Sequence, residues 1–260
     1  MIDNPLPEDW RALQNGVCRL FNEIGLNANT EVELSTPRGT VVVDVYAVDE
    51  GSVDKIKYIV ECKNWNAPIP QTVVHAFTTV MHETGANIGY IVSKAGLQSG
   101  ALRYTENTTI TGLTYQALQE RYFNVWWHKY FCINAGAAAE YVNQYVEPIN
   151  THRSRFLEKL TEDKLARYIY LHDRYAAFGM LMWLIDIGSI VPEYAVDAPP
   201  SLEEYKAKLN NVLGDEFTFR ASTYRDLLAE ICAKLVHIEE QFNEVFGRNI
   251  FEGEGGGVNP

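Results

Sequence analysis

The stretch TVVVDVYAVDEGSVDKIKYIVECKNWNAPIPQ, residues 40–71, decides how this chain folds. It holds two apolar runs, VVVDVYAV and YIVECKNW, and between them the polar cluster DEGS, which is typical of a turn. The first run carries a single acid, Asp44, and the second contains Glu61 and Lys63. The pattern predicts a hairpin that brings Asp44, Glu61 and Lys63 together on adjacent strands.

These three side chains suit a magnesium site. Residues two apart on a strand share a face, so Glu61 and Lys63 project the same way, and Asp44 can lie beside them. Charges within apolar strands are costly unless they pair or hold a cation. Magnesium takes oxygen ligands, and Asp44, Glu61 and the carbonyl of Cys62 would supply them. Lys63 would then orient or deprotonate the attacking water and offset charge on phosphorus. A solvated strand end without metal is the alternative that the residues leave open.

Hydrophobic periodicity predicts the other elements of the first half. Glycine and proline mark most of the boundaries. We expect helices over residues 10–24, about 70–83 and 97–105, and strands over residues 31–34, 40–48, 57–63, 88–93 and 109–115. This order predicts an α/β sandwich around a mixed sheet.

The loop Ser93-Lys94-Ala95-Gly96 follows a predicted strand and precedes a predicted helix. Such a loop can contact phosphate through a lysine and backbone amides. A plain strand-to-helix connection is the other interpretation of the same residues.

The order of these elements and charges resembles the PD-(D/E)xK nuclease superfamily, and within it the Mrr-type restriction endonucleases, over roughly residues 7–120. The resemblance implies a restriction-endonuclease-like mixed sheet flanked by helices, and magnesium-dependent cutting of DNA, with manganese as a substitute. It implies that Asp44 and Glu61 bind the metal and that Lys63 is the catalytic lysine. Gln71, at the start of a helix, and Glu23, on the first helix, are the further active-site residues that it implies. Val43 stands where the family commonly has Pro or Gly.

The second half of the chain reads as an all-α domain. Helices are predicted over residues 137–145, 150–160, 163–187, 202–213 and 222–246. The aromatic positions Tyr122, Phe123, Trp126, Trp127 and Tyr130 recur at helical spacing, which favours packing over stacking with unpaired bases. We expect a nuclease domain over residues 1–120, a helical domain over 121–250, and a disordered glycine-rich tail over 251–260.

One short motif in the helical half points to a different chemistry. Four residues stand between Arg167 and His172, and that spacing resembles the R-x4-6-H signature of HEPN-type ribonucleases. There, the histidine would act as acid or base and the arginine would hold phosphate. Packing of Arg167 against Glu162 or Asp163 is the structural alternative.

Composition limits the classes of function. The chain of 260 residues has a formal net charge of −12, which disfavours tight unaided binding to DNA. The four cysteines are scattered without zinc or disulfide spacing. Neither a secretory signal nor a membrane span is apparent, so we expect a cytoplasmic protein.

The sequence thus predicts a Mg²⁺-dependent DNA endonuclease, which the resemblance links to defence against foreign DNA. The alternative from another class is a non-catalytic module that binds nucleic acid or protein on a nuclease fold. A homodimer or larger assembly through the helical domain is compatible with both. The sequence leaves the choice between DNA and RNA, and the strandedness of the substrate, open.

Overall fold

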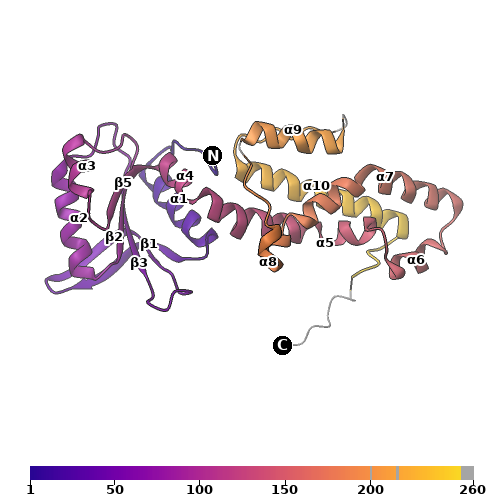
Figure 1. Ribbon diagram of the computed structural model, residues 1–260, viewed down its shortest axis with the longest axis horizontal. Coiled ribbons are helices and arrows are strands. Elements are labelled where there is room, and N and C mark those ends of the chain that lie inside the picture. Colours follow the sequence, from indigo (N-terminus) through magenta and orange to yellow (C-terminus); the bar gives the residue numbers. More distant parts are fainter. Residues whose placement is uncertain (200, 215–216, 253–260) are drawn as a thin grey trace. The chain divides into compact units, whose positions relative to one another are not determined.

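The computed structural model describes residues 1–199, 201–214 and 217–252, and the chain divides into two compact units, Met1–Lys129 and Tyr130–Pro260 (Figure 1). The boundary lies nine residues later than the sequence predicted. The reason is the helix α4 (Tyr115–Trp126), which contacts the sheet of the first unit and buries Leu118 and Trp126.

The first unit contains five strands and, besides α4, three helices in its described residues. In chain order these are α1 (Trp10–Glu23), β1 (Asn27–Thr36), β2 (Gly39–Val48), β3 (Lys57–Lys63), α2 (Gln71–Thr84), β4 (Ile88–Ser93), α3 (Ser99–Thr105) and β5 (Ile110–Thr114). The strands lie in the order β1-β2-β3-β4-β5. The first three are antiparallel, and β3, β4 and β5 are parallel. The predicted mixed sheet is confirmed.

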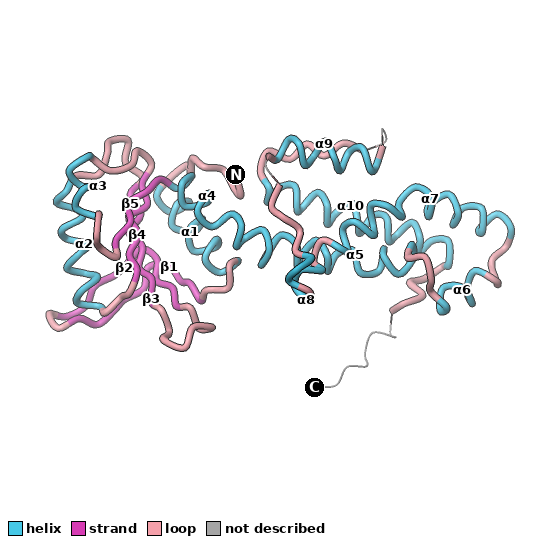
Figure 2. The backbone as a smooth tube through the Cα atoms, in the orientation of Figure 1, coloured by secondary structure: helices cyan, strands magenta, loops and turns pink. Residues whose placement is uncertain are grey.

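Helices cover both faces of this sheet (Figure 2). The helix α1 contacts β1, β2 and α4, whereas α2 and α3 contact each other on the opposite side. The helix α2 packs Phe77 and Met81 onto the sheet. These two side chains fit against Gly89 of β4 because glycine has no Cβ atom, which would clash with them. Each buried side chain of this size contributes about 1.5–3 kcal/mol to folding.

Local signals in the sequence set the helix ends. The Asp9 carboxylate caps α1 by accepting a hydrogen bond from the Ala12 amide at 2.7 Å. Gly85 ends α2 in the left-handed conformation, with φ of 64°, as a residue without Cβ can. These ends match the sequence prediction to within one or two residues.

All secondary-structure elements in the described residues of the second unit are helical. The unit begins within the π-helical segment η1 (Trp127–Cys132). Its further elements are α5 (Ile133–Val146), α6 (Thr151–Leu157), α7 (Glu162–Leu184), α8 (Ile187–Ile190), the 3-10 turn η2 (Pro192–Tyr194), α9 (Leu202–Leu213) and α10 (Tyr224–Phe246). The helices α5, α7 and α10 pack on one another. The all-α prediction is confirmed, although α5 begins four residues earlier than expected.

Aromatic side chains build much of the core of this unit. Tyr145 stacks on Phe242 with ring centroids 4.9 Å apart, and Phe251 meets Tyr145 edge-on. Because Phe251 is buried, the chain stays packed at this residue, which the sequence had assigned to the disordered tail. Residues 253–260 of that predicted tail lie outside the described residues.

The aromatic stripe near residue 126 is packing, as predicted. Trp126 and Trp127 are fully buried, and the Tyr122 hydroxyl hydrogen-bonds that of Tyr90 at 2.9 Å. None of the helices in the described ranges has the length and apolar character that a bilayer crossing requires.

Candidate active site

Asp44 and Glu61 lie on neighbouring strands at one end of the β2–β3 ladder. The last paired residues are Val45 and Val60, and Asp44 and Glu61 are the next residues beyond them on the two strands. One carboxylate oxygen of Asp44 accepts a hydrogen bond from the Cys62 amide at 2.7 Å. The predicted hairpin therefore places the two acids at the same end of the ladder.

Lys63 completes the trio. Its ammonium group forms an ion pair with the Glu61 carboxylate, and both side chains are largely shielded from solvent. Burial acts to lower the pKa of Lys63, but the hydrogen bond and negative charge of Glu61, helped by Asp44, outweigh it and raise the pKa above its usual value. Lys63 is therefore held as a cation beside the two carboxylates.

The helix α1 adds a residue that the sequence analysis missed. The side-chain amide of Gln14 donates a hydrogen bond to the second carboxylate oxygen of Asp44 at 2.8 Å. Gln14 is only 4% exposed, although it is polar. A polar residue within the apolar stripe of an amphipathic helix was the available signal, because burial requires such a group to find a partner.

Glu23, the other predicted contribution of the first helix, lies elsewhere. Its carboxylate accepts a hydrogen bond from the indole nitrogen of Trp126 at 2.7 Å. Gln14 and Glu23 are nine residues apart, which is ~13 Å along a helix axis. The prediction that Glu23 belongs to the site is therefore corrected: α1 presents Gln14 to Asp44 and presents Glu23 to α4.

Gln71 begins α2, as predicted, but its side chain is engaged on that helix. Its amide hydrogen-bonds the ring of His75 at 3.1 Å, and the His75 ring lies 4.4 Å from that of Tyr104 in α3. The structure thus groups Gln71 with α3 rather than with Asp44 and Glu61. Its role in the chemistry stays a prediction.

The Cys62 side chain is buried in the core, although the residues on either side of it, Glu61 and Lys63, are charged. The side chain is buried, and burial, followed by the charges of Asp44 and Glu61, raises the pKa of the thiol well above its usual value. The thiol is therefore neutral and is no nucleophile. The predicted metal contact through the Cys62 carbonyl stays a prediction.

Asp44 and Lys63 line a pocket of about 490 Å³, here called the carboxylate pocket, and Glu61 is tied to it through its ion pair with Lys63. Its lining comes from the segment around the start of α1, from β1 and β2, and from the end of β3, and consists of Glu8, Asp9, Trp10, Gln14, Glu31, Asp44, Cys62, Lys63, Asn64 and Trp65. Trp10 and Trp65 are each 46% exposed, so two large aromatic faces are open to solvent at this pocket. Its rim is acidic.

Glu31 is placed at this pocket by an irregularity in β1. It stands opposite Asp44 in register, between the paired residues Thr30 and Val32, but is not itself paired. Its φ of 52° is left-handed, a conformation that non-glycine residues seldom adopt in a strand. The sequence contains no feature that predicts this.

The donor set fits a hard divalent cation. Asp44 and Glu61 would supply carboxylate oxygens, and magnesium is usually held by one or two carboxylates together with water and substrate phosphate. Across the described part of the chain, no three His, Cys, Asp or Glu side chains come together as a complete protein cage. A cation here would therefore keep positions open for water and phosphate.

The ribonuclease-like motif of the helical unit does not converge in the same way. Arg167 donates to the Gln241 side chain at 3.2 Å and lies over the Tyr170 ring. The His172 ring hydrogen-bonds the Val146 carbonyl oxygen at 3.1 Å. Arg167 therefore has a structural role, which was the alternative to catalysis in the sequence analysis. Its partners are Gln241 and Tyr170 rather than the expected Glu162 or Asp163.

Residues 7–122 match the family model of restriction endonucleases, in its Mrr catalytic-domain form. The chain is also similar to the crystal structure of a protein of unknown function, AF1548, at 14% identity over 88% of this chain and 98% of that one, with a TM-score of 0.35. A likeness this loose supports neither a fold nor a function. None of the curated proteins matches the sequence.

Proposed function

We propose that this protein is a Mg²⁺-dependent endonuclease that hydrolyses phosphodiester bonds of DNA, on the premise that residues 7–122 match the restriction endonuclease family model. The observation that carries the proposal is that Asp44 and Lys63 line one pocket and that Lys63 forms an ion pair with Glu61. A shared metal site also explains why two carboxylates lie together, which would otherwise be an electrostatic cost.

Each residue has a distinct task in this proposal. Asp44 and Glu61 hold the cation, and Gln14 fixes the orientation of Asp44 through its hydrogen bond. When bound, the cation supplies an activated water and neutralises charge on the phosphate. Lys63, held as a cation, stabilises the negative charge that builds up on phosphorus in the transition state.

The open tryptophans support a nucleic acid as the substrate. Trp10 and Trp65 border the same pocket as Asp44 and Lys63, and aromatic faces bind unpaired bases by stacking. Stacking does not depend on a basic surface, so it suits a chain with a net charge of −12. Defence against foreign DNA and dimerisation through the helical unit are proposed on the family resemblance.

A second candidate is a non-catalytic binding module on the same fold. The observation that favours it is the acidic rim, where Glu8, Asp9 and Glu31 add negative charge beside the proposed ligands. Those acids repel the phosphate backbone unless cations offset them. The module therefore predicts binding without cutting.

Cleavage of plasmid and linear DNA separates the two candidates. We expect the wild type to cut with added Mg²⁺ or Mn²⁺ and to stop in EDTA. Asp44→Ala and Lys63→Ala should both be inactive, whereas Lys57→Ala, at the other end of β3, should cut like the wild type. If Asp44→Ala and Lys63→Ala cut as fast as the wild type, the proposed site is wrong. If the wild type cuts no substrate, the binding module is favoured.

A further inference from the structure

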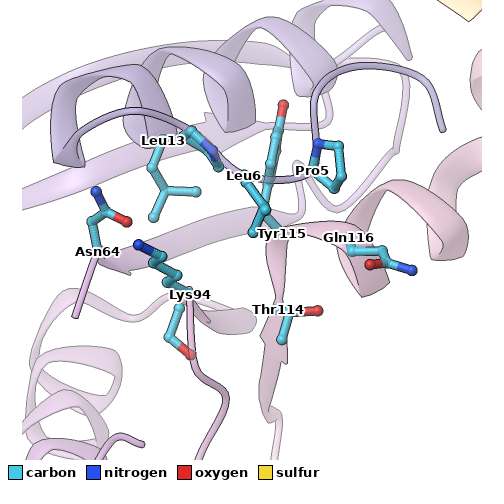
Figure 3. A pocket seen from close by; sticks show the side chains of 10 residues that line it. Pro5, Leu6, Leu13, Asn64, Lys94, Thr114, Tyr115 and Gln116 are labelled. Atoms are coloured by element: carbon cyan, nitrogen blue, oxygen red, sulfur yellow. The ribbon is translucent and has the colours of Figure 1, made fainter. Parts of the chain in front are cut away.

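A second, smaller pocket lies beside the carboxylate pocket in the first unit. It has a volume of about 90 Å³ and is bounded by the segment before α1, by residues that follow β3 and β4, and by the start of α4 (Figure 3). We call it the strand-end pocket, because the parallel strands β3, β4 and β5 all end there. Ligands of α/β proteins commonly bind at the carboxyl ends of parallel strands.

Two buried polar atoms belong to this pocket and have no partner. Ser93 and Asn64 both line it, and Ser93 is fully buried. Among the described residues, neither the Ser93 hydroxyl oxygen nor the Asn64 side-chain carbonyl oxygen has a hydrogen-bond partner. Buried polar groups are rarely left in this state, so a ligand or water that accepts a hydrogen bond from the Ser93 hydroxyl is implied. The Asn64 oxygen can only accept, so its partner is a donor such as water.

The surroundings favour a negatively charged ligand. The twelve-residue helix α4 begins at the pocket, and its first turn contains no acid. The positive end of its dipole attracts anions, while the Thr114 hydroxyl caps the helix by accepting a hydrogen bond from the Ala117 amide at 3.1 Å. Lys94 lines the same pocket, with its ammonium group 3.0 Å from the Asn66 side-chain oxygen, and Figure 3 shows Lys94 beside Asn64, across from Thr114 and Tyr115.

The two neighbouring pockets therefore differ in electrostatic character. Four acids line the carboxylate pocket, whereas the described lining of the strand-end pocket contains none. Asn64 lines both, and it follows Lys63 directly in the chain. A nucleic-acid strand that is cut beside Lys63 thus passes the strand-end pocket within a short distance.

We propose that the strand-end pocket binds one phosphoryl group of the substrate strand, next to the phosphate that is cut. This inference rests on the proposed nuclease function. The Ser93 hydroxyl donates a hydrogen bond to the phosphate, and Lys94 and the positive end of the α4 dipole supply positive potential. A volume of about 90 Å³ holds several water-sized groups, at roughly 10–15 Å³ each, which is enough for one phosphoryl group.

The test is binding of labelled oligonucleotides, measured without metal so that no strand is cut. Strands of one sequence carry a 5′-phosphate, a 3′-phosphate or hydroxyl groups at both ends, and inorganic phosphate is added as a competitor. Ser93→Ala removes the buried hydroxyl while leaving a residue that the core accepts. Ser99→Ala, exposed at the start of α3, is the matched control.

Ser93→Ala should weaken binding by about ten- to a hundredfold, because it removes one hydrogen bond to a charged group. A loss confined to strands with one kind of phosphorylated end identifies a terminal phosphate as the ligand. An equal loss for all strands identifies an internal phosphate. Ser99→Ala should bind like the wild type in either case.

Unchanged binding of every strand to Ser93→Ala overturns the inference and leaves water as the occupant. If no strand binds but inorganic phosphate raises the melting temperature of the wild type and not of Ser93→Ala, the anion site stands and the proposed nuclease function fails. If DNA is cut normally while Ser93→Ala binds all strands like the wild type, the inference alone fails.

Discussion

The two units of this protein each contain a sequence motif that resembles those of nucleases, but the structure treats the two motifs differently. In the sheet unit, Asp44 and Lys63 line an open pocket, and Lys63 forms an ion pair with Glu61. In the helical unit, Arg167 and His172 are each bound to structural partners. The spacing of two residues along the chain is therefore a weak guide to function until the helix or strand that contains them is known.

The largest expected effect comes from removing a proposed metal ligand. Glu61→Gln should lower the rate of DNA cleavage by about 10³-fold, since several kcal/mol of transition-state stabilisation would be lost at 1.36 kcal/mol per tenfold. The measurement is the initial rate of plasmid cutting in Mg²⁺. Glu33→Gln, an exposed acid of β1, is the control and should keep the wild-type rate. Equal rates for the two variants would remove Glu61 from the site.

A smaller effect is expected from Gln14, which touches Asp44 rather than the substrate. Gln14→Ala should raise the Mg²⁺ concentration for half-maximal cleavage about tenfold, because groups that orient metal ligands typically change metal affinity by 10–100-fold. The rate should recover substantially at saturating Mg²⁺. Gln98→Ala, exposed before α3, should behave like the wild type. A variant that loses activity at every Mg²⁺ concentration while staying folded would contradict a positioning role.

The two units also differ in what their exposed tryptophans should do. Trp65→Ala should weaken binding of single-stranded DNA about tenfold, because stacking contributes about 1–3 kcal/mol per base. Trp183→Ala, similarly exposed on α7, should leave binding unchanged. Fluorescence anisotropy with a labelled strand measures both. Equal losses in the two variants would place DNA binding on the helical unit as well.

The smallest effect on cleavage is expected from the helical motif. Arg167→Ala and His172→Ala should keep cleavage of both DNA and RNA within about twofold of the wild type. His172→Ala should instead lower the free energy of unfolding by about 0.5–1.5 kcal/mol, because the Val146 carbonyl loses its partner. Urea denaturation measures this change. If either variant lost nuclease activity without losing stability, the interpretation of this motif as a ribonuclease site would be supported.

Local sequence signals predicted most of the first unit. The bounds of β3 and β4 match the prediction, since apolar runs bounded by polar turn residues determine both. The strand β1 is longer than predicted because pairing with β2 recruits the polar residues Asn27 and Asn29. Such recruitment depends on the partner strand and is invisible in the segment itself.

The candidate site was predictable where one hairpin supplies it and unpredictable where a distant element completes it. Asp44, Glu61 and Lys63 follow from strand alternation and a turn. Gln14 lies thirty residues before Asp44, and nothing in the helix pattern says what its buried face meets. The same limit explains why Glu23 was predicted in place of Gln14. Glu23 lies on the same helix, α1, but in a turn that contacts Trp126.

The most direct test of the account is the rate of plasmid cleavage as a function of Mg²⁺ concentration, for the wild type and for Asp44→Asn. Asparagine keeps the size of the side chain and much of its hydrogen bonding but removes its charge. The account predicts that wild-type cutting rises with Mg²⁺ and vanishes in EDTA, while Asp44→Asn does not cut at any concentration. Cutting by Asp44→Asn at the wild-type rate, or wild-type cutting that persists in EDTA, would contradict it.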